Sequence, residues 1–266
     1  MVGALSVQKP GLADSLLELT QAAELHGEHG YWLLDRSALP SRWLREKLNS
    51  SPWVDMLRGR EATDRTAPTP VLIDASPDGQ AENRFTRFAN EVHGVAAYAN
   101  AVSFLTSPLK MDALQAALRS RARVELPQKL EVVLRYFDTR TLPLLPTLFT
   151  PMQYAGFVQD VTTWHYLDRR GELLCLPPGL LQQAGQLVAQ PWVLDDAQEA
   201  MLIDDGLTDA AIDHLITQGL GDLLDLSPPE QFDKVDPVVM RARRQGVLEH
   251  TQVFEFVVNA LDEANV

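Results

Sequence analysis

The 266-residue chain has little of several residue types and patterns, and each scarcity excludes a class of protein. Cys175 is the one cysteine, which excludes an intramolecular disulfide and a multi-cysteine zinc site. The longest mostly apolar stretch, residues 94–105, is well short of the roughly 18 residues of a membrane helix. The first residues lack the early positive charge and apolar core of a signal peptide. We therefore expect a cytoplasmic protein with a reduced thiol and no membrane insertion.

Positive charge is also scarce. The chain has 23 Lys and Arg against 36 Asp and Glu, for a net charge of -13, which disfavours nucleic acid and anionic membranes as partners. Residues 181–266 hold 16 acidic and 4 basic side chains, whereas residues 1–180 hold 20 acidic and 19 basic ones. Such a change in charge along a chain indicates a domain boundary. The sequence predicts two domains, residues 1–180 and residues 181–266.

The first domain shows short apolar runs that alternate with helical patterns. Strands are predicted at residues 31–34, 71–73, 101–105 and 130–137, and helices at 12–26, 41–48, 81–93, 107–118 and from 138 onward. Residues 162–167 and 172–176 flank a turn sequence and predict a terminal β-hairpin. Alternating strands and helices favour an α/β fold with a parallel or mixed sheet.

The second domain has no convincing strand after residue 195 and predicts a small all-α lobe. Asp195 begins one helix, and Thr208 is expected to cap a second, short one that ends at Gly219. Ser227 and Glu230 have the spacing of a capping box. A further helix is expected to begin at Asp236, and the last one spans about residues 253–261.

Two short matches to catalytic or metal motifs have plainer interpretations. Ser107 and Lys110 have the Ser-x-x-Lys spacing of penicillin-binding enzymes, but the other motifs of those enzymes are missing, and Ser107 is expected to cap a helix. His26, Glu28 and His29 could offer metal ligands, but they follow a helix whose C-terminus favours histidine. The chain also lacks glycine-rich phosphate loops and a nucleophile elbow. We expect no catalytic residue, no metal site and no cofactor.

Three further groups leave alternatives open. An acid–base site can be assembled on paper from two carboxylates and two imidazoles, although nothing in their spacing requires it: Glu91, His93, His165 and Asp168. Cys175 lies in an apolar strand and is expected to be a buried, inert thiol, with a nucleophile as the alternative. The basic run at residues 119–123 is either paired with a helix dipole or a contact for an acidic partner.

The segment from Arg135 to Arg140 is the richest in information. Asp138 can cap the helix that follows, and either Arg135 or Arg140 can hold its carboxylate in an ion pair. The alternative is that these residues bind a partner at the C-terminal edge of the sheet.

Residues 135–142, Arg-Tyr-Phe-Asp-Thr-Arg-Thr-Leu, resemble the "FRFYDPRVL" signature of the type VI secretion effector adaptor (chaperone) family. Other motifs of that family follow in order. Residues 31–35 are similar to its opening "YALLD" strand, 70–73 to its next strand, 104–119 to its "fl-x-S" and "L-x-x-H-L-R" run, and 164–171 to its hairpin. Ala117 and Thr139 depart from the histidine and proline that the family often has.

The resemblance implies a non-catalytic cytoplasmic adaptor that binds a secreted effector and helps load it onto the spike protein of the secretion apparatus. It marks Arg135, Tyr136, Asp138, Arg140 and Trp164 as structural or partner-binding residues. Two alternatives stay open at this point: an enzyme of unknown class, and an immunity or regulatory protein that neutralises a toxin.

Overall fold

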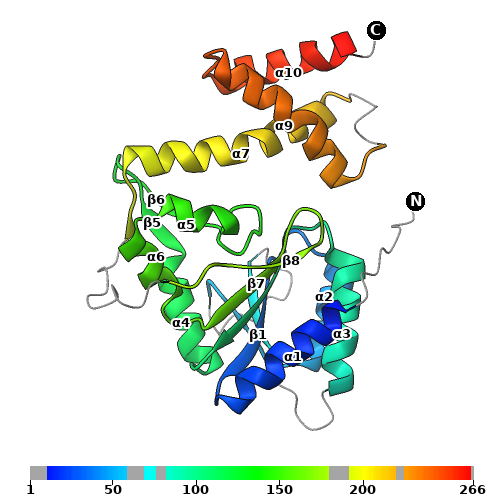
Figure 1. Cartoon of the computed structure of the whole chain (residues 1–266), viewed down its shortest axis with the longest axis vertical. Coiled ribbons are helices and arrows are strands. Elements are labelled where there is room, and N and C mark those ends of the chain that lie inside the picture. The colour runs from blue at the N-terminus through cyan, green and yellow to red at the C-terminus, as the bar shows by residue number, and fades with distance from the viewer. Residues whose placement is uncertain (1–10, 59–68, 76–81, 180–191, 220–224, 265–266) are drawn as a thin grey trace. The chain divides into compact units, whose positions relative to one another are not determined.

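A computed structural model describes residues 11–58, 69–75, 82–179, 192–219 and 225–264 (Figure 1). The chain divides into two compact units, unit 1 (residues 1–196) and unit 2 (residues 197–266). The predicted boundary between residues 180 and 181 lies outside the described residues.

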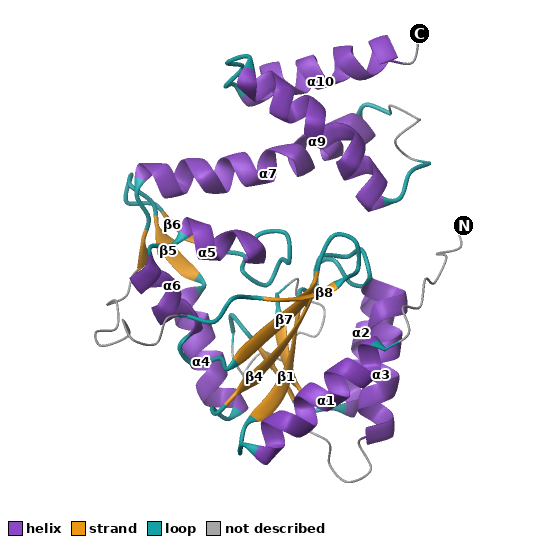
Figure 2. Ribbon diagram, viewed as in Figure 1, coloured by secondary structure: helices purple, strands orange, loops and turns teal. Residues whose placement is uncertain are grey.

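Unit 1 is the α/β part of the molecule, and its strands and helices follow one another as Figure 2 shows. In chain order its elements are α1 (Leu12–Leu25), β1 (His29–Leu34), α2 (Ser41–Ser50), β2 (Trp53–Asp55), β3 (Val71–Asp74), α3 (Glu82–Ala96), β4 (Val102–Ser107), α4 (Met111–Arg121), β5 (Arg123–Glu125), β6 (Glu131–Val133), the 3-10 helix η1 (Leu142–Leu144), α5 (Leu145–Leu148), α6 (Pro151–Val158), β7 (Thr163–Leu167), β8 (Leu173–Cys175) and β9 (Trp192–Val193).

The larger sheet has the strand order β2-β3-β1-β4-β7-β8. An α/β lobe followed by an all-α lobe confirms the predicted fold class. The direction of the strands differs from the prediction, because all neighbours in this sheet are antiparallel. The helices α2 and α3 do join strands that run the same way, but each crossover skips a position. β3 lies between β1 and β2, and β1 lies between β3 and β4.

A second sheet has the order β6-β5-β9. The predicted strand over residues 130–137 is wrong in its extent, because β6 spans Glu131–Val133, and it pairs with β5 rather than with the larger sheet. The strand β9 runs parallel to β5, and the bond from Leu194 N to Glu125 O continues this pairing. β9, which precedes α7 in the sequence, therefore belongs to the smaller sheet of unit 1.

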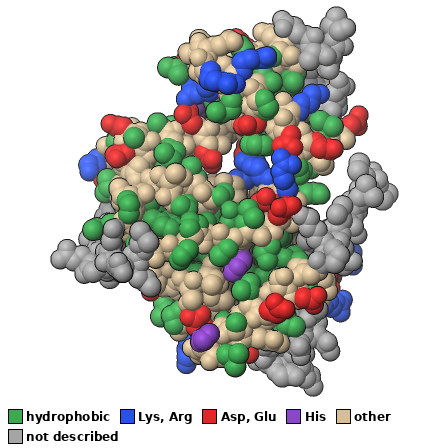
Figure 3. All heavy atoms as spheres, viewed as in Figure 1, with side chains coloured by type: hydrophobic (Ala, Val, Ile, Leu, Met, Phe, Trp, Pro, Cys, Tyr) green, Lys and Arg blue, Asp and Glu red, His purple; other side chains and the backbone are tan. Residues whose placement is uncertain are grey.

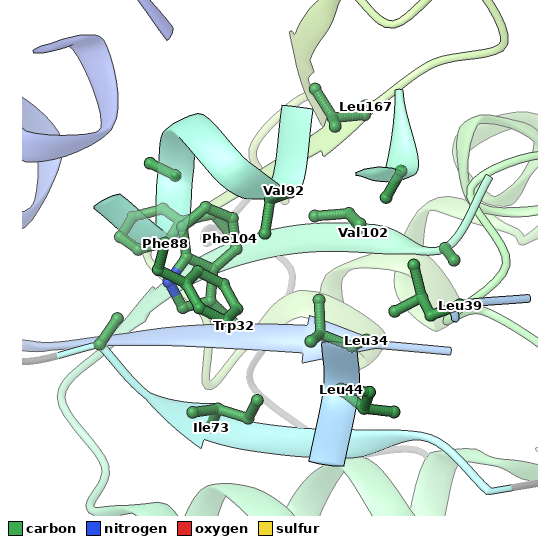
Figure 4. Packing of buried hydrophobic residues seen from close by; sticks show 14 of the residues in the cluster. Trp32, Leu34, Leu39, Leu44, Ile73, Phe88, Val92, Val102, Phe104 and Leu167 are labelled. Atoms are coloured by element: carbon green, nitrogen blue, oxygen red, sulfur yellow. The ribbon is translucent and has the colours of Figure 1, made fainter. Parts of the chain in front are cut away.

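One hydrophobic core of unit 1 lies between one face of the larger sheet and the helices α1, α2 and α3. Trp32 on β1 is central to it. The Trp32 ring lies 5.0 Å from the ring of Phe88 on α3 and 5.3 Å from that of Phe104 on β4, measured between centroids (Figure 4). Such aromatic contacts add to the free energy that burial of the rings contributes.

The described helices of unit 2 are α7 (Asp196–Thr217), α9 (Pro228–Arg244) and α10 (His250–Ala264). The predicted break at Thr208 is wrong, because α7 is continuous and the Thr208 hydroxyl donates 2.9 Å to Asp236 Oδ1 on α9. The predicted start at Asp236 is wrong as well, since α9 runs through Pro237. The capping box of Ser227 and Glu230 is confirmed.

Candidate functional site

Four charged side chains from two distant segments meet at one end of the larger sheet. Asp35 directly follows β1, and its Oδ2 accepts a 2.8 Å hydrogen bond from Arg135 Nη2. Arg140 binds the Asp138 carboxylate through Nε, 2.9 Å from Oδ1, and Nη2, 2.6 Å from Oδ2. Arg135 Nη2 also lies 3.9 Å from Asp138 Oδ2, which joins the two ion pairs. We call these four residues the charged cluster.

The charged cluster is buried on its acidic side and open on its basic side. The side chains of Asp35 and Asp138 are 3% and 7% exposed, whereas that of Arg135 is 50% exposed and that of Arg140 is 33% exposed. A buried carboxylate needs such partners, because removing an ion from water is costly. The buried carboxylates thus hold the two guanidinium groups in place, while part of each arginine side chain is exposed to solvent.

Asp138 shapes the local backbone but does not cap a helix as predicted. Its Oδ1 accepts from Arg140 N at 3.0 Å, two residues along, which is an Asx turn. The next helical element begins only at Leu142 and has Thr141 as its N-cap. Asp138 instead stabilises the turn that precedes this helical element, since its own carbonyl accepts hydrogen bonds from Thr141 N and Leu142 N.

Thr139 ties this turn to two neighbouring strands. Its backbone N–H donates 2.9 Å to Asn100 O, just before β4, and its hydroxyl donates 2.6 Å to Leu167 O at the end of β7. Thr139 is 1% exposed. The proline that often stands here in the resembling family would lack both donors, so this chain fixes the turn with its own pair of bonds.

Tyr136 and Trp164 lie in the core rather than in the charged cluster. The fully buried Tyr136 packs edge-on against Trp164, with ring centroids 5.8 Å apart, and Trp164 stacks on Phe157 at 5.7 Å. The Tyr136 hydroxyl donates 3.0 Å to Leu118 O, and burial raises its pKa. These rings support the turn that carries Asp138.

Of the predicted residues, Arg135, Asp138 and Arg140 come together, with Tyr136 and Trp164 packed apart from their ion pairs. Asp35, a member of the charged cluster, and Thr139, which holds the turn beside it, are not among the predicted site residues. Asp35 had a signal, since it ends the strand motif at residues 31–35, but its contact with Arg135 spans 100 positions in the sequence. Whether these residues bind a partner stays a prediction.

The near-matches to catalytic and metal motifs have structural partners. Ser107 does not cap α4, which begins at Met111. Its Oγ accepts from Leu109 N at 3.0 Å and donates to Asp160 O at 2.6 Å. His26 is the C-cap of α1, as expected. Among the residues that the structure describes, no three His, Cys, Asp or Glu side chains are placed to hold a metal ion.

Glu91 and Asp168, two residues of the candidate acid–base group, bind different partners. Glu91 on α3 accepts from Trp43 Nε1 and Arg87 Nε, while Asp168 accepts from the backbone of its own hairpin turn. Cys175 is exposed, so the expected burial is wrong, because β8 is an edge strand.

The basic run at residues 119–123 does not lie wholly in solvent. Arg121 is buried, donates to Phe157 O at 2.8 Å and forms an ion pair with Asp160. Burial lowers the pKa of this guanidinium, and Asp160 opposes that shift. Arg123 remains exposed and pairs with Glu131 at 2.6 Å.

Comparison with known proteins gives one result. No curated protein matches the chain, and no solved structure matches it. In the described part of the chain, none of the helices has the length and apolar character that crossing a membrane requires. Residues 30–155, from β1 to α6, match the family model described as "Domain of unknown function (DUF4123)", and this segment contains the whole charged cluster.

Proposed function

We propose that this chain is a non-catalytic cytoplasmic adaptor that binds a secreted effector and helps load it onto the spike protein of a type VI secretion apparatus. The match of residues 30–155 to the family of unknown function supports the proposal at the level of the domain. The ordered resemblance of the sequence motifs to the effector adaptors supports the finer statement.

The observation that carries the proposal is the meeting of two of those motifs in the charged cluster. The strand motif ends at Asp35, the signature contributes Arg135, Asp138 and Arg140, and the two are joined at 2.8 Å. Arginine is enriched at protein interfaces, and a guanidinium that is already held in place loses little entropy on binding. Arg135 and Arg140 are therefore the residues that we expect to contact a partner.

The test is recovery of the tagged full-length chain from the cytosol of its native cell, followed by mass spectrometry. We expect an effector and a spike protein to be enriched together. The Arg135→Ala variant is expected to recover at least tenfold less effector, which corresponds to about 1.4 kcal/mol of binding free energy. Arg42→Ala is the matched control, because Arg42 is an arginine of the same domain whose side chain is 95% exposed.

Recovery of neither protein would contradict the proposed adaptor function. Equal recovery of the effector by both variants would contradict the contact assigned to Arg135, and the adaptor would then bind its partner elsewhere. Thermal unfolding of each variant must accompany the recovery, since a loss of effector in an unfolded variant reports stability and not contact.

A further inference from the structure

The strand β8 presents an open edge of the larger sheet. It pairs with β7 on one side, and no described strand lies on its other side. Leu176 N donates to Trp164 O at 2.8 Å, and Asp168 N donates to Glu172 O at 2.9 Å. Because bonding alternates along an antiparallel pair, Leu174 bonds to β7 while Leu173 and Cys175 direct their N–H and C=O groups outward.

A mostly apolar pocket lies beside Leu176, the residue that directly follows β8. Its volume is about 210 Å³. Leu176 and Trp164 line the pocket from the β7–β8 hairpin, and Ala155 and Val158 line it from α6. Leu174 shares the face of Leu176 and is 41% exposed, so it extends the apolar surface along β8. Figure 3 shows hydrophobic side chains gathered where α5, α6 and the chain that leaves β8 lie in Figure 1.

The segment after β8 that lines the pocket, residues 176–179, is held in place by α6. The Tyr154 hydroxyl donates 2.6 Å to Pro177 O, which fixes the chain after β8 against the helix. Gly179 belongs to this segment, and a Cβ there would lie 2.7 Å from Val158 Cγ2, so only glycine allows this close approach. The pocket is thus a built feature between an edge strand and a helix.

The charge of the site defines what it can take. The pocket lining contains no Lys, Arg, Asp or Glu, and neither does β8. A charged group would lose its hydration there without a partner. The complementary occupant is an uncharged segment, and the outward N–H and C=O groups of β8 match an extended backbone.

We infer that β8 and this pocket form a strand-addition site for an extended, uncharged segment of a partner protein, which places one aliphatic side chain in the pocket. Strand addition obtains affinity from backbone hydrogen bonds and specificity from such pockets. The inference deepens the proposed adaptor function and rests on it for the identity of the partner, while its geometry rests on β8 and α6 alone.

The test uses the full chain and a neutral synthetic peptide, acetyl-Thr-Val-Thr-Leu-Thr-Val-Thr-amide, with amide exchange followed by NMR. At about 2 mM peptide, we expect exchange at Leu173 and Cys175 to slow at least tenfold. The amide of Leu174 is the internal control, because it already bonds to β7 and its exchange should not change.

Two variants with matched controls separate the backbone from the pocket. Cys175→Pro removes one outward donor and is expected to weaken peptide binding at least tenfold, whereas Cys175→Ser keeps that donor and the affinity. Val161→Asp places a carboxylate at the pocket and is expected to weaken binding at least as much, whereas Val161→Thr keeps the shape without the charge.

Unchanged exchange at Leu173 and Cys175 would overturn the inference, and so would full affinity in both Cys175→Pro and Val161→Asp. These outcomes are distinct from failure of the proposed function. If the effector and spike protein are recovered with the chain but the peptide leaves β8 unprotected, the adaptor function stands and strand addition is wrong. If the peptide slows exchange at β8 but neither protein is recovered with the chain, strand addition stands and the adaptor function is wrong.

Discussion

At the scale of single residues, Asp138 is the side chain on which the charged cluster depends. Its carboxylate accepts a hydrogen bond from the Arg140 backbone N–H and binds the Arg140 guanidinium through both oxygens. Asp138→Ala should lower the free energy of unfolding by about 2 kcal/mol, because it removes hydrogen bonds to a charged group and leaves Arg140 without this buried partner. Chemical denaturation at neutral pH measures this loss.

The hairpin turn between β7 and β8 provides a matched control. Asp168 Oδ1 accepts from Arg170 N at 2.9 Å and Glu172 N at 2.7 Å, so it makes a comparable turn at a more exposed place. Asp168→Ala should cost about 1 kcal/mol. Equal losses in the two variants would mean that the ion pair with Arg140 adds nothing to the turn.

The pair of Asp35 and Arg135 tests the long-range part of the same cluster. Asp35 is buried and Arg135 is half-exposed, so solvent screens the pair only on one side. A double-mutant cycle with Asp35→Asn and Arg135→Gln should give a coupling free energy of about 1 kcal/mol. A coupling near zero would show that Arg135 is held by the stacking of its guanidinium on Phe137, whose ring centroid lies 5.7 Å away.

At the scale of elements, Glu91 joins α2 to α3. Its carboxylate accepts from Lys47 and Trp43 on α2 and from Arg87 on α3. The hydrogen bond from Lys47 contributes most to lowering the pKa of Glu91 from 4.5 to about 2, burial opposes the shift, and Arg87 adds to it. The charged carboxylate is therefore favoured in the folded state.

The sign of the resulting pH dependence follows from that lowered pKa. The stabilisation is complete above pH 4.5, the ordinary value, and is lost as the pH falls toward about 2. Glu91→Gln should be less stable than the parent chain by about 1 kcal/mol at pH 7, a figure reduced for solvent screening. The difference should shrink in thermal unfolding between pH 4.5 and pH 3. A constant difference over that range would assign the loss to packing instead of charge.

The elements also show what the sequence could predict. Strands such as Val71–Asp74 were located because buried strands read as short apolar runs. The relative directions of neighbouring strands cannot be predicted in this way. A crossover that skips a position in the sheet gives the same alternation of strands and helices in the sequence as one that does not. A hydroxyl favours a helix start, so the sequence predicts a cap at Thr208, but the Thr208 hydroxyl donates to Asp236 on α9 from within a continuous helix. Contacts across tens of residues decided each difference.

At the scale of the whole molecule, charge is unevenly distributed. The last 86 residues carry 16 acidic and 4 basic side chains. In α7, the charged side chains include Asp196, Glu199, Asp204 and Asp209, and the helix has no Lys or Arg, while three of the four cations lie together at residues 241–244 near the end of α9. An acidic lobe of this kind favours encounter with a basic or mixed-charge partner.

The association rate with the recovered effector should therefore fall at least tenfold as the salt concentration rises from about 20 mM to about 500 mM, because salt screens the field of the acidic lobe. Neutralising three of its exposed acids should remove much of that dependence: Glu249→Gln, Glu255→Gln and Asp262→Asn. The same change on α1 keeps the total charge equal and should have little effect: Asp14→Asn, Glu18→Gln and Glu24→Gln. A rate that does not change with salt would assign the acidic side chains to solubility alone. Equal effects of the two triple variants would mean that net charge steers the encounter, with no contribution from the place of the acids in the molecule.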